Sequence, residues 1–160
     1  SILNDKLDNA INLKNIKIIN IIKSSLRTPD IISFSKCYGK DYEPKNLFKE
    51  HKYYCSNTSS NHYILFDFST EYFVSDFTMI YHSSCLKCKP QNFRVVIMDE
   101  NMNIVNIQKF CNKEISLKEE NYAIYNKGRY IKLELLDNFG GEYIMIRDIT
   151  FYCICIHLIL

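Results

Sequence analysis

A histidine and two cysteines at regular spacing form the sharpest chemical motif in the sequence. His82, Cys85 and Cys88 follow an apolar segment as an H-x-x-C-x-x-C run. Gaps of two residues allow successive ligands to wrap around one tetrahedral zinc ion, so a zinc site is one interpretation. Its fourth ligand would come from Cys37, Cys55 or Cys111. A disulfide between Cys85 and Cys88 is a second interpretation, and an ordinary surface loop is a third.

The sequence carries no recognisable catalytic motif. Cys85 or Cys88 could act as a nucleophile with His82 and Asp76, but no nucleophile elbow or matched cysteine and histidine signature accompanies them. The four glycines form neither a G-x-G-x-x-G turn nor a Walker loop. We therefore expect a protein that is not an enzyme and that uses no cofactor.

The composition fits one soluble globular domain. The chain has 160 residues, a net charge of +2 and 47% hydrophobic residues, which suit a single core. No apolar run reaches the roughly 18 residues that a membrane-spanning helix needs, so we expect no transmembrane segment. Because the chain opens at Ser1 and stops within an apolar run, we expect it to belong to a larger polypeptide.

The cysteine count bears on the cellular compartment. The chain has seven cysteines, and an odd number cannot be fully paired within one chain. This count favours reduced thiols and an intracellular protein. The triplet Asn57-Thr58-Ser59 is a formal glycosylation acceptor and is the opposing indication, for a secreted protein. Intracellular is the location that we expect.

The first part of the chain differs in pattern from the rest. Apolar side chains over residues 2–26 recur at helical spacing, and Pro29 ends the pattern. We predict an N-terminal α-helical segment over residues 1–28, followed by a β domain over residues 29–160. The alternative is a strand over residues 16–22, where β-branched residues are frequent.

From residue 31 onward, short aromatic and β-branched runs alternate with polar turns. We predict strands at 31–35, 62–68, 73–81, 93–98, 104–110, 129–135 and 143–155. In the second of these, Ile64, Phe66 and Phe68 alternate with more polar positions, as expected for a strand with one buried face. The pattern predicts a mostly β protein, an antiparallel β-sandwich.

Three polar breaks predict turns. Residues 99–103 suit a hairpin, and residues 126–128 can supply a positive backbone angle before Arg129. Residues 138–141 form a glycine-containing loop with Phe139 at its tip. Phe139 is either a local plug or an exposed contact residue, and the sequence favours the plug.

Several of these stretches, in order, resemble a discoidin domain, the coagulation factor 5/8 C-terminal type. They are residues 32–47, with Tyr42-Glu43-Pro44-Lys45-Asn46-Leu47; Tyr54-Cys55-Ser56; residues 62–68; Pro90-Gln91-Asn92-Phe93-Arg94-Val95; residues 128–133; and residues 138–152. The resemblance covers about residues 31–155 and implies a jelly-roll sandwich of the galactose-binding-like superfamily. The pattern is most similar to the cytoplasmic branch that includes the amino-terminal domain of muskelin, which implies a role in protein association.

The sequence departs from this family at two points. Secreted members usually join a cysteine near the start of the domain to one near its end; Cys153 matches the second, but no cysteine precedes Ile31. Tyr54 stands where a tryptophan is usual, and Lys49-Glu50-His51-Lys52 replaces an acidic turn. We therefore carry over neither bound calcium nor a sugar-stacking role from the family.

The resemblance implies a non-catalytic module whose end loops recognise a protein partner, or else a glycan or a lipid head group. Aromatic and basic side chains on such loops supply most contact energy per residue. The predicted contact residues are Tyr38, Lys40, Tyr42, His51, Tyr53, His82, Lys87 and Phe139. The alternative is a zinc-stabilised or redox-sensitive scaffold centred on His82, Cys85 and Cys88.

Nucleic acid is an unfavoured partner. Lysines and tyrosines interleave over residues 36–54, as in proteins that bind single strands. Acidic residues, namely Asp41, Glu43 and Glu50, interrupt this stretch and weaken its attraction for phosphate. We expect no nucleic-acid partner.

Overall fold

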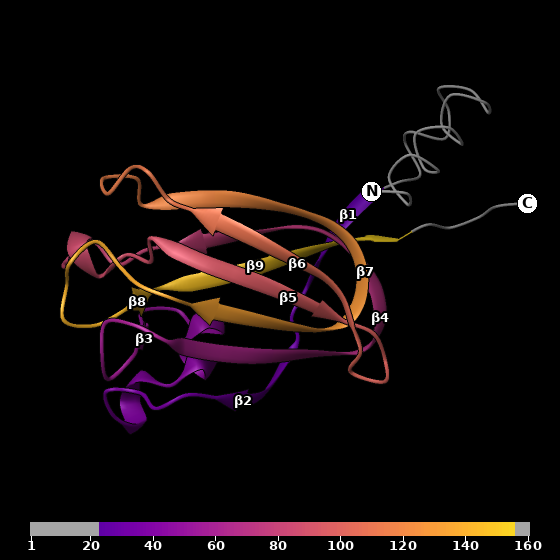
Figure 1. The fold of residues 1–160 in the computed structure, drawn as a ribbon, viewed down its shortest axis with the longest axis horizontal. Helices are drawn as coiled ribbons and strands as arrows, with labels where there is room; N and C mark the ends of the chain where they lie inside the picture. The colour runs from indigo at the N-terminus through magenta and orange to yellow at the C-terminus, as the bar shows by residue number, and fades with distance from the viewer. Residues whose placement is uncertain (1–22, 156–160) are drawn as a thin grey trace, which may run out of the picture.

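The computed structural model describes residues 23–155, which form an antiparallel β-sandwich (Figure 1). The strands are β1 (Lys23–Arg27), β2 (Asp30–Phe34), β3 (Tyr54–Cys55), β4 (His62–Ile80), β5 (Asn92–Met98), β6 (Ile104–Cys111), β7 (Glu119–Leu135), β8 (Met145–Ile146) and β9 (Asp148–Cys155). Three short 3-10 helices lie between strands: η2 (Lys40–Tyr42), η3 (Pro44–Phe48) and η4 (Leu86–Cys88).

Strands β4 and β7 build both layers because each changes partners half way along. The main sheet runs in the order β1-β9-β4-β7-β5-β6, with β2 also paired to β4, while β3 and β8 form a separate pair. The start of β4 pairs with the end of β7, and its second half pairs with β9 and the start of β7. Figure 1 shows both long strands bending at the same end of the molecule. The predicted strands 62–68 and 73–81 are therefore two halves of one bent strand.

Aromatic side chains fill the space between the layers. The predicted alternation is confirmed, since Ile64, Phe66 and Phe68 are buried while the residues between them are partly exposed. The Phe151 ring lies 5.1 Å from that of Phe66 and 5.3 Å from that of Phe68, in edge-to-face contact. Because such contacts add to the burial of large apolar surfaces, the aromatic residues act mainly as core.

The N-terminal helix prediction is wrong for its last residues. Lys23–Arg27 form β1, an antiparallel partner of β9, with Lys23 opposite Cys155 and Arg27 opposite Phe151. Pairing with an existing strand edge here overrides the helical spacing of the apolar residues. Residues 1–22, which carry the rest of the predicted helix and the alternative strand 16–22, lie outside the described residues, so the separate segment 1–28 stays a prediction there.

The turns agree only in part with the sequence. The hairpin at residues 99–103 is confirmed: the Asp99 carboxylate accepts the backbone N–H groups of Asn101 and Asn103, each at 2.9 Å. The positive backbone angle expected within residues 126–128 instead lies at Tyr125, where φ is 49°. Gly128 serves a different purpose, because its backbone passes close to the side chain of Ile97.

A polar network lies at the end of the sandwich that carries β3 and β8. The Asn112 amide donates to the carbonyl oxygen of Pro90 at 2.8 Å and accepts from the Tyr122 hydroxyl at 2.6 Å. The Lys89 ammonium, almost fully buried, donates to the carbonyl oxygens of Glu114 and Leu117. These bonds hold the chain between β6 and β7 against the start of β5, where no regular sheet pairing does so.

The buried imidazole of His62 predicts a dependence of stability on pH. Its Nδ1 lies 2.8 Å from the Ser35 hydroxyl and its Nε2 lies 2.7 Å from the Thr58 hydroxyl. Burial lowers the pKa of His62, while an interaction with the Thr58 backbone opposes that shift. The unfolded chain therefore binds a proton more readily than the folded one, and the free energy of unfolding should fall as the pH drops below about 6.5.

Denaturant unfolding at about pH 7.5 and about pH 5.5 checks this expectation. The drop in the free energy of unfolding between the two pH values should be smaller in His62→Gln than in the wild type. His82, whose pKa burial and Arg147 also lower, supplies a remaining drop in the variant. An equal drop in both proteins would show that His62 does not contribute.

Candidate binding site

Four tyrosines from separate parts of the chain converge at one end of the sandwich. Tyr38, Tyr42, Tyr53 and Tyr143 line a cavity of about 360 Å³, which we call the tyrosine pocket. Its remaining wall consists of Cys55, Cys85, Cys88 and Met145. This volume is in the range of cavities that hold small organic ligands.

The four rings form a chain of contacts, from Tyr143 through Tyr38 and Tyr42 to Tyr53. The Tyr38 ring lies 5.3 Å from that of Tyr42 and 5.0 Å from that of Tyr143, both edge to face, and the Tyr42 ring lies 5.4 Å from that of Tyr53. Edge-to-face contacts orient rings with respect to one another. Because Tyr38 remains 56% exposed, the cluster presents aromatic surface to solvent as well as to its own members.

A buried amide positions two of these tyrosines. Asn46, in η3, donates from its side chain to the carbonyl oxygen of Asp41 at 2.6 Å and to that of Tyr53 at 3.0 Å. It thereby ties the turn that carries Tyr42 to the segment that carries Tyr53. The loop residue Tyr38 is held separately, because its backbone N–H donates to the carbonyl oxygen of Cys55.

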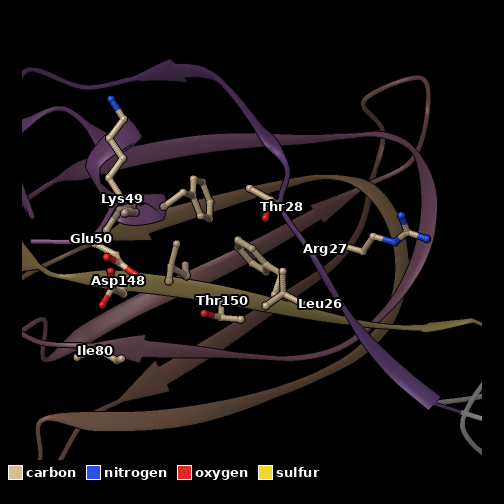
Figure 2. Close-up of a pocket in the computed structure, with 12 residues that line it drawn as sticks. Leu26, Arg27, Thr28, Lys49, Glu50, Ile80, Asp148 and Thr150 are labelled. Carbon is tan, nitrogen blue, oxygen red and sulfur yellow. The ribbon is translucent and has the colours of Figure 1, made fainter. Parts of the chain in front are cut away.

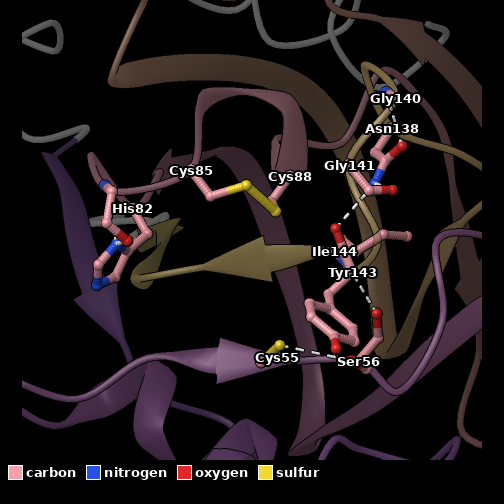
Figure 3. The surroundings of a disulfide bond; sticks show 11 residues. Cys55, Ser56, His82, Cys85, Cys88, Asn138, Gly140, Gly141, Tyr143 and Ile144 are labelled. Atoms are coloured by element: carbon pink, nitrogen blue, oxygen red, sulfur yellow. Dashed lines mark hydrogen bonds between the residues drawn. A yellow bond between two sulfur atoms is a disulfide. The ribbon is translucent and has the colours of Figure 1, made fainter.

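Two loops packed against each other form the opposite wall (Figure 3). Cys85 and Cys88 are joined by a disulfide across the turn of η4. The Gly141 backbone N–H donates to the carbonyl oxygen of Lys87 at 3.0 Å, and a Cβ atom on Gly141 would lie 2.9 Å from the Cys88 sulfur. The Asn138 amide donates to the carbonyl oxygens of Gly141 and Tyr143, which sets the position of Tyr143.

The disulfide decides between the interpretations of the H-x-x-C-x-x-C run. Both sulfurs are bonded to each other, so they are not thiolates that could hold zinc. The His82 Nδ1 accepts the backbone N–H of Ser84 at 3.1 Å. Within residues 23–155 no group of three or more His, Cys, Asp or Glu side chains is arranged to hold a metal ion. The zinc hypothesis therefore loses two of its ligands, and the disulfide alternative is the one observed.

The thiols near the pocket are poor nucleophiles. Burial raises the pKa of the Cys55 thiol to about 11. Burial, with a smaller effect of Glu43, raises the pKa of the Cys37 thiol to about 11 as well. Both thiols are therefore protonated near neutral pH, whereas a cysteine nucleophile must be a thiolate. The two cysteines considered as nucleophiles from the sequence, Cys85 and Cys88, are held in the disulfide.

The structure places the predicted contact residues at different points around this site. Tyr38, Tyr42 and Tyr53 line the tyrosine pocket. His82 lies against the ring of Tyr53, with 4.3 Å between ring centroids. His51 and His82 both line a smaller hollow beside the tyrosine pocket. Lys87 is exposed and lines a further hollow between the disulfide loop and residues 140–143.

Two predicted contact residues do not line these hollows. Lys40 is exposed in η2. Phe139 is half-buried, which is intermediate between a local plug and an exposed contact residue. Sequence reasoning also missed wall residues, above all Tyr143 and Met145, because residues 143–155 read as one continuous strand. Tyr143 lies in the connection between β7 and β8, where the Asn138 amide holds its carbonyl oxygen, and no local pattern signals this position.

A second groove lies beneath the connection from β1 to β2 (Figure 2). It has a volume of about 300 Å³ and an apolar floor that includes Leu47 and Phe151. Figure 2 shows the carboxylates of Glu50 and Asp148 close together at one end. Burial raises the pKa of Asp148, Glu50 raises it further, and Arg147 opposes both. The aromatic residues that line this groove are Phe48 and Phe151, and none of the tyrosines within residues 23–155 lines it.

Comparison with known proteins identifies the fold. No model of a known protein family matches the chain, and no curated protein matches it in sequence. Many solved structures match in three dimensions. The lectin domain of lectinolysin, complexed with Lewis b antigen, is 16% identical with a TM-score of 0.64, and the match covers 78% of this chain and 92% of that one.

Two bacterial domains give similar results. The Streptococcus pneumoniae fucose-binding module SpX-3 is 12% identical with a TM-score of 0.65, over 79% of this chain and 94% of its own. The C-terminal domain of a chitobiase from Bacteroides fragilis is 16% identical with a TM-score of 0.67, over 84% of this chain and 100% of its own. These neighbours support the β-sandwich fold predicted from the sequence.

The described residues include no helix with the length and apolar character to cross a membrane.

Proposed function

We propose that the domain is a non-catalytic module that binds a saccharide in the tyrosine pocket. The observation that carries the proposal is the convergence of four tyrosine rings on one cavity at an end of the sandwich. A tyrosine offers an apolar ring face to the C–H face of a sugar and a hydroxyl to its polar groups. It also supplies a large contact area with few rotatable bonds, so little conformational entropy is lost on binding.

Solved structures of the same fold support this choice of ligand. Several solved structures of the same fold are named for the saccharides that they bind, including Lewis b antigen and fucose. A binding role, rather than a catalytic one, also agrees with the protonated thiols beside the pocket. The discoidin and muskelin assignments, the protein partner and the intracellular location stay predictions from the sequence.

Loss of one pocket tyrosine should weaken saccharide binding. Tyr42→Ala and Tyr143→Ala each remove ring surface from the wall and are expected to weaken binding by about tenfold, the effect of roughly 1.4 kcal/mol. An immobilised panel with Lewis b, fucosylated, galactose-terminated, chitosan-derived and acidic saccharides identifies a ligand. Calorimetry with that ligand then measures the affinity of each variant.

Tyr125→Ala is the matched control, because Tyr125 is an exposed tyrosine of β7 that does not line the pocket. Its affinity should equal that of the wild type. If the panel shows no saccharide binding, or if the pocket variants bind as well as the control, the saccharide proposal is wrong. Specific retention of a protein partner that depends on Tyr42 and Tyr143 would instead support the protein-binding prediction.

A further inference from the structure

Basic side chains line another hollow, directly beside the tyrosine pocket. Its volume is about 250 Å³, and we call it the basic pocket. It is lined by His51, Lys52, Tyr53, His82, Ser83 and Arg147. These residues come from three segments that lie far apart in the sequence: the loop before β3, the loop after β4, and the junction between β8 and β9. No acidic side chain is among the described residues that line it.

The charge of Arg147 is only partly neutralised. Its Nε lies 3.5 Å from a carboxylate oxygen of Asp148, which is the one ion pair of Arg147 among residues 23–155. The Arg147 side chain is 54% exposed, so its terminal N–H groups can reach a ligand. Since a guanidinium has five N–H donors in a planar fork, the terminal groups can bind a carboxylate or sulfate while Nε faces Asp148.

His82 adds a neutral N–H donor to the lining of this pocket. The backbone N–H of Ser84 can only donate, so Nδ1 of His82 accepts, and the neutral ring carries its hydrogen on Nε2. Burial and the positive charge of Arg147 lower the pKa of His82, which keeps the ring neutral near pH 7. The pocket therefore combines a guanidinium, a lysine and a neutral N–H donor.

Tyr53 connects the two hollows. Its ring contacts the His82 imidazole at 4.3 Å on one side of the cluster and the Tyr42 ring at 5.4 Å on the other. Tyr53 lines both the basic pocket and the tyrosine pocket. A sugar ring packed in the tyrosine pocket can therefore extend a substituent past Tyr53 toward Arg147.

We propose that the basic pocket binds a negatively charged substituent, a carboxylate or a sulfate ester, of the saccharide held in the tyrosine pocket. The inference rests on the proposed function and narrows its ligand to acidic saccharides. Carboxylate and sulfate share the oxygen acceptors that arginine, lysine and an imidazole N–H bind. Carboxylated and sulfated forms of the same saccharide distinguish these two sources of charge.

The test uses lactose, chitotriose and fucosylated lactose, each immobilised in a neutral, a carboxylated and a sulfated form. The wild-type chain should bind at least one charged form about tenfold more tightly than its neutral counterpart at low salt. This preference should shrink as the sodium chloride concentration rises, because salt screens exposed charges. The stronger of the two charged forms identifies the natural substituent.

Variants separate the two pockets. Arg147→Gln and Lys52→Gln should each reduce the preference for the charged form and leave neutral binding unchanged. Lys109→Gln, which removes an exposed charge on β6 away from both pockets, should change neither. Tyr42→Ala should weaken the neutral and charged forms alike. Circular dichroism confirms that each variant is folded.

The two proposals fail in different ways. A wild-type protein that binds neutral and charged forms equally, or a preference that survives the double variant of Arg147 and Lys52, would overturn the acidic-saccharide inference and leave the tyrosine pocket intact. Charged-form binding that depends on Arg147 but not on Tyr42 would contradict a shared ligand and the saccharide role of the tyrosine pocket. Absence of binding to every form would reject both.

Discussion

Replacing Lys89 with Met should destabilise the domain by about 3 to 5 kcal/mol, the cost of removing one partner from a buried ion pair. The Lys89 ammonium lies 2.6 Å from a carboxylate oxygen of Glu120, and its side chain is 1% exposed. It also donates to the carbonyl oxygens of Glu114 and Leu117, at 2.6 Å and 3.0 Å. Methionine keeps most of the length but leaves these three acceptors without their donor.

Denaturant unfolding monitored by circular dichroism measures the loss. Lys127→Met is the matched control, because Lys127 also pairs with a glutamate, Glu71, at 3.2 Å but is 60% exposed. An exposed pair contributes about 1 kcal/mol or less, so this variant should remain near the wild type. Adding Glu120→Gln to Lys89→Met should restore part of the stability by removing the unpaired charge. Equal effects of the two lysine variants would contradict the role assigned to Lys89.

Gly128→Ala should destabilise the domain by about 1 to 3 kcal/mol through overpacking. A Cβ atom at this position in β7 would lie 2.5 Å from a methyl carbon of Ile97 and 3.1 Å from the carbonyl oxygen of Met98. Ile97 is fully buried in the core, so its side chain has little room to move. The variant must therefore shift either the Ile97 side chain or the backbone of β7 beside the end of β5.

Gly39→Ala is the control for this variant. A Cβ atom on Gly39 would meet a ring carbon of Tyr42 at 3.7 Å, an ordinary contact, and its φ of −174° is accessible to alanine. Both substitutions remove the same glycine flexibility from the unfolded chain, so the difference between them reports the steric conflict in the folded state. We expect Gly39→Ala to be neutral or slightly stabilising, and comparable losses in both variants would refute the close-contact explanation.

The sequence predicted the strands well where side chains alternate. Residues 62–68 and 129–135 carry a repeat of two that follows directly from strand geometry, and each lies in an observed strand. The helical spacing before Pro29 was misleading at residues 23–26, because there the edge of β9 is available for pairing. The positive angle at Tyr125 was also missed, since a tyrosine does not signal that conformation.

Part of the tyrosine pocket, the candidate site, was also accessible from the sequence. Tyr38, Tyr42 and Tyr53 are aromatic residues in polar connections between predicted strands, and such positions favour contact roles. Arg147 and Tyr143 were not accessible in this way, because they lie in a stretch whose apolar pattern suggests a single buried strand. The position of Arg147 depends on where β8 ends and β9 begins, and that of Tyr143 depends on the connection from β7 to β8.

The amino-acid sequence by itself determined that this chain is a β-sandwich with an aromatic core, because strand alternation and turn chemistry are local properties. Only the tertiary structure decided that Cys85 and Cys88 form a disulfide, and that Tyr143 and Arg147 join the loops around Tyr53. These placements depend on the register of β3 with β8 and of the long strands with each other. Pairing between residues far apart in the sequence sets that register, and a local pattern does not encode it.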